Sequence, residues 1–269
     1  MLKKIIFLLL IVCFQLSALA QVKLCSWNLK NFGKSKADTT ITFIAKTLKN
    51  YDVIAIQEVV AGPGGAQAVA RLANELNLTG TKWDYTVSDP TSGDSYKKER
   101  YAFLWKSKTV QKKGKAWLEQ KYHLEIDREP YFCTFQYKGK SFTVVNFHAI
   151  TKKKQPETEI KYFKHLPQQY PDKNLIFVGD FNCPQSHSVF NPLKKMGYQS
   201  VFVNQKTSLK NECKKEVCLA SEFDNIFYHS SKIKVLNFKP ILFYEAFASL
   251  KQAKYISDHI PITMQFSIL

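Results

Sequence analysis

The sequence predicts one layered α/β domain, and three observations support this prediction. After Gln21, short apolar runs alternate with segments in which apolar residues recur with the period of a helix. The 269 residues are 45% hydrophobic and include 20 Phe and 13 Tyr, enough material for a sizeable core. No repeat, low-complexity stretch or linker divides residues 21–269. We therefore expect a single folded domain, and disordered or collagen-like chains are excluded.

The first twenty residues have the pattern of a secretory signal peptide. Two early lysines are followed by the apolar run 5–14, and small residues occupy the −3 and −1 positions of a cut before Gln21. A ten-residue apolar run is too short for the roughly 20 residues that a membrane-spanning helix needs. We predict a signal peptide over residues 1–20, export to the periplasm or out of the cell, and no stable membrane span.

The elements of the domain follow in order along the chain. Helices are expected at residues 41–48 and 66–76, where apolar residues keep a helical spacing; the second follows the loop Gly62-Pro63-Gly64-Gly65. Lys138-Gly139-Lys140 separates two strands and predicts a hairpin, so the sheet is not purely parallel. The expected strands are 22–27, 53–56, 101–105, 131–137, 141–147, 175–178, 226–228 and 260–266.

Export would permit disulfide bonds in the mature chain. Cys213 and Cys218 are close enough in sequence to bridge a short loop. Cys25, Cys133 and Cys183 lie in or beside apolar runs, so we expect them to pack as small hydrophobic residues. No Cys/His spacing resembles a zinc site.

The chain is strongly basic, with 39 Lys and Arg against 22 Asp and Glu and a formal net charge of +17. Such a charge attracts anionic polymers, among them nucleic acids, and anionic membranes. A basic, soluble, exported protein with no such partner has the same composition, so charge alone leaves these alternatives open.

Several strands run from apolar residues directly into an amide, an acid or an imidazole. They end at Asn28, Glu58, His148 and the pair Asp180 and Asn182. A fifth polar run, Ser257-Asp258-His259, precedes a strand, so antiparallel pairing would bring it to the same rim. Carboxylate and amide oxygens suit Mg²⁺, Mn²⁺ or Ca²⁺ rather than zinc. With two imidazoles as acid and base, the group predicts hydrolysis of a phosphate ester.

The same residues form an ordered set that resembles the endonuclease/exonuclease/phosphatase superfamily over nearly all of residues 22–268. The set is Trp27-Asn28, Gln57-Glu58, Asn146-Phe147-His148, Gly179-Asp180-Phe181-Asn182 and Ser257-Asp258-His259. Within the superfamily the chain most resembles the deoxyribonuclease I group, through Ser95-Tyr96-Lys97-Lys98-Glu99-Arg100-Tyr101 and Arg128-Glu129-Pro130. The resemblance implies a four-layered α/β sandwich: two mainly antiparallel mixed sheets flanked by helices, with the site at one end.

The resemblance also implies a role for each matching residue. Glu58 would be the principal ligand of Mg²⁺, with Mn²⁺ or Ca²⁺ as alternatives, assisted by Asn28 and Asp258, and Asp180 would lie close to the metal or the attacking water. Six further positions would carry the reaction or hold substrate: His148 with Glu99 and His259 with Asp224 as acid/base pairs, Asn182 on the scissile phosphate, and Arg128 on a phosphate.

The chain departs from the deoxyribonuclease I pattern in two places. Two residues after Glu58, that group carries an arginine that enters the DNA minor groove, whereas Val60 stands here. Lys97-Lys98 has one residue more than the motif. The lysines at 152–154 and those at 112, 113 and 115 could bind backbone phosphates instead, or could be solvated faces.

We therefore predict an exported, metal-dependent phosphodiesterase, a DNA endonuclease of low sequence specificity that acts as a monomer. A phospholipid or small-phosphoester hydrolase of the same superfamily, sphingomyelinase-like or a phosphatase, is the alternative enzyme. A non-catalytic nucleic-acid-binding module is the alternative from another class.

Overall fold

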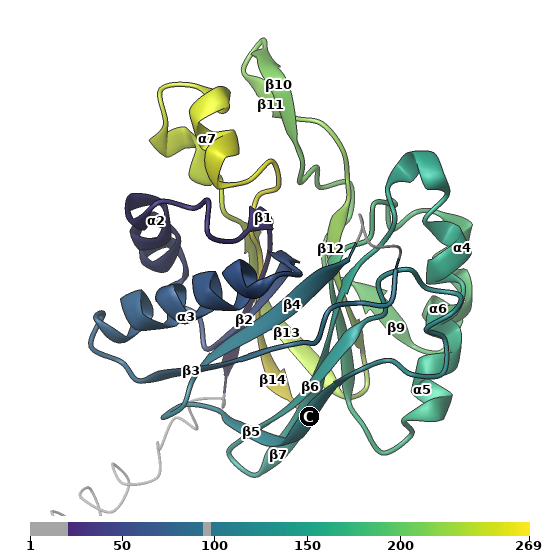
Figure 1. Cartoon of the computed structure of the whole chain (residues 1–269). Coiled ribbons are helices and arrows are strands. Elements are labelled where there is room, and N and C mark those ends of the chain that lie inside the picture. Colours follow the sequence, from purple (N-terminus) through teal and green to yellow (C-terminus); the bar gives the residue numbers. More distant parts are fainter. Residues whose placement is uncertain (1–20, 94–97) are drawn as a thin grey trace, which may run out of the picture.

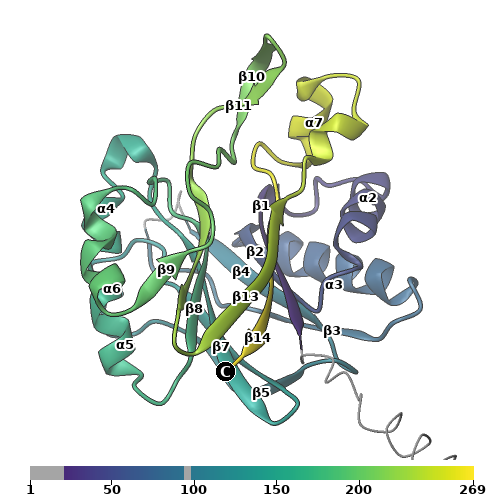
Figure 2. The same ribbon diagram turned by 180° about the vertical axis from the view of Figure 1, so that it is seen from behind.

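The computed structural model describes residues 21–93 and 98–269, which form two six-stranded sheets packed face to face between two layers of helices (Figures 1 and 2). The predicted four-layered α/β sandwich is therefore confirmed. The predicted signal peptide, 1–20, lies outside the described residues.

The first sheet contains both ends of the described chain, and its strand order is β13-β14-β1-β2-β4-β3. Only β1 and β2 are parallel neighbours; the other pairs are antiparallel. The strands are β1 (Val22–Phe32), β2 (Val53–Val60), β3 (Trp83–Val87), β4 (Glu99–Lys106), β13 (Ile233–Pro240) and β14 (Ile262–Ile268).

The second sheet has the order β5-β6-β7-β8-β12-β9, with β7 and β8 as its parallel pair. Its strands are β5 (Gln111–Leu118), β6 (Tyr131–Tyr137), β7 (Lys140–His148), β8 (Leu175–Asp180), β9 (Tyr198–Ser200) and β12 (Asp224–His229). The hairpin predicted around Lys138-Gly139 joins β6 to β7, and both of these residues have positive φ, as a tight turn requires.

All eight predicted strands are present, but the four edge strands β3, β5, β9 and β13 were not predicted. Edge strands carry charged residues on solvated positions, and β5 has the sequence QKKGKAWL. Such a strand lacks the apolar pattern by which a central strand is recognised.

Helices cover the outer face of each sheet. On the first sheet these are α2 (Asp38–Leu48), α3 (Pro63–Asn77), η4 (Phe243–Ala246) and α7 (Leu250–Ile256). On the second they are η1 (Lys152–Lys154), α4 (Glu157–Ile160), η2 (Phe163–His165), α5 (Leu166–Gln169), η3 (Ser188–Phe190) and α6 (Asn191–Lys195). Both predicted helices begin three residues earlier than expected, α2 at Asp38 and α3 at Pro63. The start of α3 lies inside the expected glycine loop, because Pro63 is favourable in the first helical turn.

Three apolar cores separate the four layers, and β1 shows how one strand serves two of them. Leu24 points into the core between the sheets, while its neighbour Cys25 and also Trp27 point outward against the helices. This alternation is the two-residue period of a strand that is buried on both faces. The core residues of β1 are fully buried, and the polar residues Ser26 and Asn28 are buried between them.

The topology brings several strand ends to one rim of the sandwich. The parallel pairs β1–β2 and β7–β8 each end there, and antiparallel β12 begins there with Asp224 opposite Asp180. The two sheets are tied together just below the rim, where Gln57 Nε2 donates to Asn146 Oδ1 at 2.6 Å. Both residues are fully buried.

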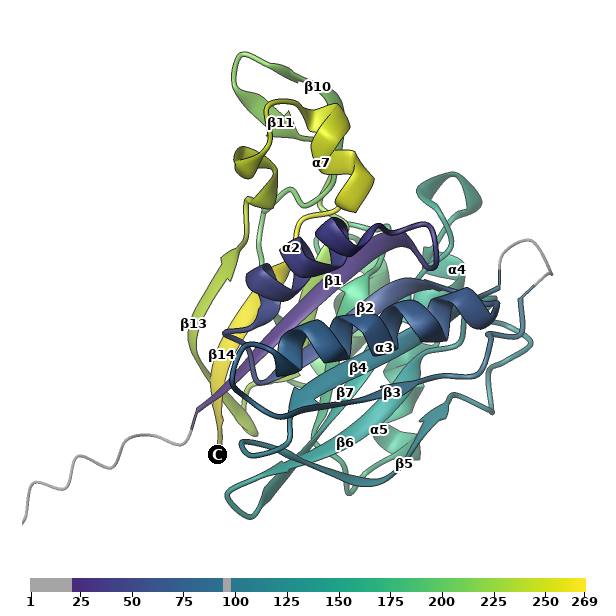
Figure 3. The same ribbon diagram turned by 60° about the vertical axis from the view of Figure 1, so that its left-hand side comes forward.

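A small hairpin stands above the sandwich at this rim, beside α7 (Figure 3). It consists of β10 (Leu209–Lys214) and β11 (Val217–Leu219), and the predicted Cys213–Cys218 disulfide joins its two strands. The other three described cysteines are buried thiols, as predicted.

Candidate active site

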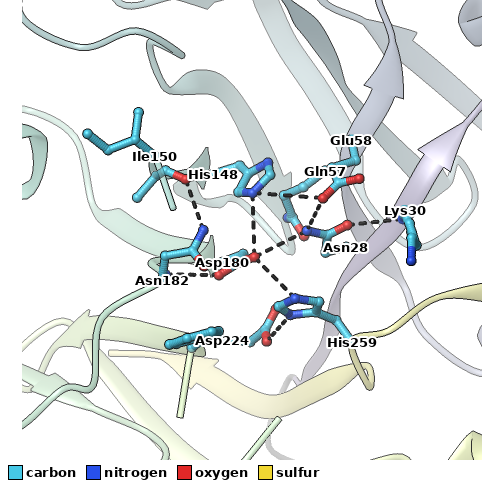
Figure 4. Close-up of polar contacts among 12 residues, drawn as sticks. Asn28, Lys30, Gln57, Glu58, His148, Ile150, Asp180, Asn182, Asp224 and His259 are labelled. Atoms are coloured by element: carbon cyan, nitrogen blue, oxygen red, sulfur yellow. Dashed lines mark hydrogen bonds and ion pairs between the residues drawn. The ribbon is translucent and has the colours of Figure 1, made fainter. Parts of the chain in front are cut away.

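Six polar side chains from six segments meet at the rim (Figure 4): Asn28 of β1, Glu58 of β2, His148 of β7, Asp180 of β8, Asp224 of β12 and His259 of the loop before β14. They lie up to 231 positions apart in the chain, from Asn28 to His259. The structure therefore brings together most of the residues that the sequence singled out.

A β-bulge aims Glu58 into this group. The pairing of β2 with β4 shifts register between Ile56 and Val59, and Glu58 has a φ of +58°. A non-glycine residue in this left-handed region costs about 1–3 kcal/mol and persists only where the surroundings hold it. The carboxylate is held on both sides: Oε1 accepts from Asn28 Nδ2 and Oε2 from the Asn31 N–H, each at 3.0 Å.

Asp180 lies at the centre of the group. Its Oδ2 is 3.5 Å from Nε2 of His148 and 3.5 Å from Nε2 of His259, and it accepts from Asn28 Nδ2 at 3.2 Å. Its Oδ1 accepts from the Asn182 N–H at 2.9 Å. One buried carboxylate thus faces both imidazoles (Figure 4).

Gly179 is required for this placement. Its φ is +134°, and a Cβ there would lie 1.9 Å from the Phe147 carbonyl oxygen on the neighbouring strand. Only glycine lets β7 and β8 pair so closely at this point. In the next residue pair of β7 and β8, His148 lies opposite Asp180.

The first imidazole, His148, is oriented by Glu99 at the start of β4. His148 Nδ1 lies 3.0 and 2.9 Å from the two oxygens of Glu99, so it must carry a hydrogen and donate it. Arg128 Nη1 donates to Glu99 Oε2 at 3.1 Å and holds that carboxylate in place. His148 Nε2 is left pointing at Asp180.

The second imidazole, His259, is oriented in the same way by Asp224. Its Nδ1 lies 2.7 Å from Asp224 Oδ2, and its backbone N–H donates to Ser257 Oγ at 2.9 Å. Trp27 Nε1 donates to the His259 carbonyl at 2.7 Å. Ring, backbone and carboxylate are therefore all fixed before any substrate arrives.

The carboxylates raise the pKa of both imidazoles. Burial acts to lower the pKa of His259, but Asp224 and Asp180 outweigh it and raise the value to about 10. Burial and the charge of Arg128 act to lower the pKa of His148, and Glu99 and Asp180 again outweigh them and raise it. Without a bound cation, the His259 ring is therefore disposed to hold a proton at neutral pH.

Asn182 and Arg128, the predicted phosphate-binding residues, both contact the Ala149 carbonyl. Asn182, at a φ of +48°, donates from Nδ2 to that oxygen at 3.0 Å, and Arg128 Nη2 donates to it as well. The Arg128 side chain is only 12% exposed, and its Nε finds no acceptor within residues 21–93 and 98–269. A phosphate would therefore meet a guanidinium that is already held by Glu99.

The donor set fits a hard divalent cation. Glu58 Oε1 and Asp180 Oδ2 both accept from the Asn28 amide nitrogen. Asn28 Oδ1 accepts from the Lys30 N–H at 3.0 Å and, among the described residues, keeps a second lone pair. Four carboxylates in the site, those of Glu58, Glu99, Asp180 and Asp224, face one arginine and two imidazoles. A cation held by oxygen atoms would offset their charge.

Asp258, the third predicted ligand, lies at the edge of this group. Its Oδ2 pairs with Lys30 Nζ at 3.2 Å, and its side chain is 36% exposed. Asp180, Asp224 and His259 form another close group of potential metal ligands. His259 Nδ1 is hydrogen-bonded to Asp224, so this group is better arranged to hold a proton than a metal ion.

A cleft of about 520 Å³ opens beside Glu58. Glu99 and Arg128 line it on one side, and Val60, Ile150 and other residues give it apolar walls. Lys154, one of the lysines of η1, also lines the cleft. The lysines at 112, 113 and 115 are not among the described residues that line this cleft. In the sheet pairing Lys112 is level with Phe142, six residues from His148, or roughly 20 Å along the strand.

Two residues that support the site were not assigned a role from the sequence. The Tyr101 hydroxyl accepts from the His148 N–H at 3.1 Å and donates to the Arg128 carbonyl at 3.0 Å. Thr207 Oγ1 accepts from the Asp224 N–H at 2.9 Å. Tyr101 ends the motif that begins at Ser95, but residues 95–97 of that motif lie outside the described residues. Thr207 has no signal in the sequence, because its loop reaches Asp224 only in the fold.

Among the described residues, no helix combines the length and the apolar character needed to cross a membrane.

Residues 25–259 match the endonuclease/exonuclease/phosphatase family. Deoxyribonuclease gamma of Rattus norvegicus is 30% identical over 195 residues, which cover 66% of this chain and 61% of the rat protein, so less than two thirds of that relative is matched. A deoxyribonuclease of Thioalkalivibrio sp. (strain K90mix) is 25% identical over 279 residues, covering 96% of this chain and 74% of its own.

Solved structures share the fold at lower identity. The human Nocturnin catalytic domain with bound sulfate anion superposes with a TM-score of 0.67 at 15% identity, covering 93% of this chain and 95% of that one. D. rerio TDP2 complexed with a single-strand DNA product has a TM-score of 0.64 at 15% identity, covering 92% and 99%.

Proposed function

The chain belongs to the endonuclease/exonuclease/phosphatase family, and from this membership we propose that it is an exported, metal-dependent phosphodiesterase that cleaves DNA internally with low sequence specificity. One observation carries the proposal: Asp180 Oδ2 lies 3.5 Å from each of two imidazoles, and each imidazole has its own carboxylate behind it. The deoxyribonucleases among its relatives favour DNA as the substrate.

The geometry suits an in-line attack of water on a phosphodiester. Such an attack needs a group that takes a proton from water, a group that gives one to the leaving oxygen, and positive charge at the phosphate. His148 and His259 are the two proton-carrying groups, with tautomers set by Glu99 and Asp224. Their Nε2 atoms face the same carboxylate, so one substrate phosphate could contact both.

Glu58 and Asn28 would hold the metal ion, with Asp180 beside them and Asp258 within reach from the edge. A bound Mg²⁺, or Mn²⁺ or Ca²⁺, would neutralise charge on the phosphate oxygens. Asn182 would orient the scissile phosphate, and Arg128 would both hold Glu99 and meet a phosphate in the cleft.

The charge of the whole chain supports a polyanionic substrate. With 39 basic and 22 acidic residues, the protein would attract nucleic acid through its field before any specific contact forms. Val60 and its apolar neighbours line the cleft where the deoxyribonuclease I pattern has an arginine. We therefore do not propose that this protein reads bases in the minor groove.

The test is plasmid cleavage by the mature chain, residues 21–269. We expect supercoiled plasmid to be nicked and then linearised in Mg²⁺ or Mn²⁺ and to stay intact in EDTA. Glu58→Ala and His148→Ala should abolish nicking, whereas His123→Ala, on an exposed turn, should cleave normally.

Intact plasmid in every metal would overturn the DNA proposal. Release of phosphocholine from vesicles, or of phosphate from small phosphoesters, would then identify the alternative enzyme with the same machinery. Tight binding of nucleic acid without turnover would identify a binding module.

A further inference from the structure

Three hollows follow one another along the rim and share lining residues. The first is the cleft beside Glu58. The second, of about 330 Å³, lies between the end of β1 and α7, and Asn31 lines both. The third, of about 620 Å³, lies between α7 and the β10–β11 hairpin, and shares Lys251 and Lys254 with the second. The end of β1, α7 and the β10–β11 hairpin lie near one another at this rim (Figure 3). The three hollows therefore lead from the candidate active site towards the hairpin.

The middle hollow is strongly basic. Four lysines line it: Lys30, Lys36, Lys251 and Lys254. The other described residues in its lining are polar or aromatic. The part of the chain that the structure describes places no carboxylate in the lining of this hollow, although Asp258 nearby pairs with Lys30. Such a hollow favours a ligand that brings several negative charges in a row.

This basic hollow is rigidly joined to the catalytic group. Lys36 Nζ donates to the carbonyls of Tyr255 and Ile256 at 2.9 and 2.8 Å, which ties the end of α7 to the loop after β1. The base of the hairpin is tied in as well, since the Leu209 N–H donates to the Asp258 carbonyl at 2.7 Å. Lys254 Nζ donates to Asn211 Oδ1 at 3.0 Å and links α7 to the hairpin.

Tyr255 adds an aromatic surface to the same hollow. It is 77% exposed although it is a large ring on a helix, and it lines the hollow beside the lysines. Lysines along a groove with an exposed aromatic ring are the arrangement by which proteins bind single-stranded nucleic acid: the lysines contact phosphates and the ring stacks on a base. Stacking requires an unpaired base, so duplex DNA would not use this ring.

We propose that the α7 groove, defined as Asn31, Lys30, Lys251, Lys254 and Tyr255, binds a single-stranded segment of the substrate next to the scissile phosphate. The inference rests on the proposed function and extends it. The preferred substrate would be a polynucleotide with unpaired bases on the α7 side of the cut, with one base stacked on Tyr255.

The test uses the double variant Lys251→Ala/Tyr255→Ala of the mature chain. Lys36 and Lys254 stay in place, because their hydrogen bonds hold the fold. The matched control is Lys82→Ala/Tyr85→Ala, which removes the same two residue types from exposed positions just before and on the edge strand β3.

Binding is measured without turnover, by fluorescence anisotropy of a labelled 12-nucleotide thymidine oligomer in EDTA over a range of salt. We expect the double variant to bind at least about fivefold more weakly than wild type. The slope of log K against log salt should be shallower by about 0.7, the value for one lost phosphate contact on a single strand. The control variant should match wild type in both.

Cleavage then separates this inference from the proposed function. With Mg²⁺ we expect the double variant to have a raised KM for the oligomer, and unchanged turnover of bis(p-nitrophenyl) phosphate, which is too small to reach α7. Wild-type affinity and salt slope in the double variant, or tighter binding of duplex than of single strand, would overturn the α7 groove even if plasmid is cleaved. Failure of wild type to cleave any DNA would overturn the proposed function instead.

Discussion

Each imidazole of the site depends on a carboxylate behind it, and this dependence can be tested at the scale of one residue. Glu99 touches no proposed reacting atom but fixes the Nδ1 hydrogen of His148 at 2.9 and 3.0 Å. Glu99→Gln keeps the shape and removes the charge, so His148 would lose both its preferred tautomer and its raised pKa.

We expect Glu99→Gln to lower kcat for plasmid cleavage by about 10²-fold, the lower end of what general acid–base catalysis contributes. The acid limb of the pH–rate profile should shift as well, which a merely structural role would not cause. Glu125→Gln, on an exposed turn, is the control. An unchanged pH profile in Glu99→Gln would remove Glu99 from the mechanism.

The charge of His259 predicts how the stability of the metal-free protein depends on pH. Its pKa is about 10 in the fold, against 6.5 in the unfolded chain. The protonated ring therefore stabilises the fold fully below about pH 6.5, and this contribution is lost as pH rises through 10.

Urea unfolding in EDTA measures this effect. Between pH 6 and pH 9.5 we expect wild type to lose up to about 4 kcal/mol of unfolding free energy relative to His259→Gln, which cannot carry the charge. Parallel pH dependences in the two proteins would show that Asp224 and Asp180 do not hold the proton on His259.

At the scale of elements, we expect the β10–β11 hairpin to depend on its disulfide bond for stability. Most of its residues are exposed, and its turn places both Lys215 and Glu216 at positive φ without a glycine. The Cys213–Cys218 disulfide closes the hairpin across this turn. A bridge over so short a loop contributes about 2 kcal/mol by the loop-entropy estimate.

We expect Cys213→Ser/Cys218→Ser to leave the sandwich folded and to open the hairpin. Trypsin should then cut at Lys214 or Lys215 at least about tenfold faster than in the oxidised wild type, while the urea midpoint of the domain changes little. Equal cleavage rates in both proteins would show that the strand pairing alone holds the hairpin.

At the scale of the whole molecule, export is the prediction that the described residues leave untested. If residues 1–20 are a signal peptide, full-length chain expressed in a Gram-negative host should reach the periplasm with the intact mass of residues 21–269. Its Cys213 and Cys218 should resist a thiol-reactive tag until reduction. Full-length mass in the cytoplasm would contradict the prediction.

The central elements could be predicted because the apolar pattern of each segment reflects how it is buried. Strands buried on both faces, such as 53–56 and 175–178, are continuous apolar runs, and α2 and α3 keep a helical apolar spacing. The edge strands could not be predicted, because many of their residues are exposed to solvent and they lack a continuous apolar run. The site residues at the ends of the central strands could be predicted as well, because a polar residue directly after an apolar run stands out in the sequence.

By itself, the sequence determined the fold class, the short-range disulfide and the identity of the residues that meet at the rim, because these depend on local pattern or on an ordered set of motifs. Only the tertiary structure decided how those residues are arranged: that Asp180 faces both imidazoles, that Asp258 pairs with Lys30, and that Arg128 is held by Glu99. It also decided that Lys251 and Tyr255 share a groove with Asn31. Distances between side chains far apart in the chain are set by sheet register and packing, which no local stretch of sequence records.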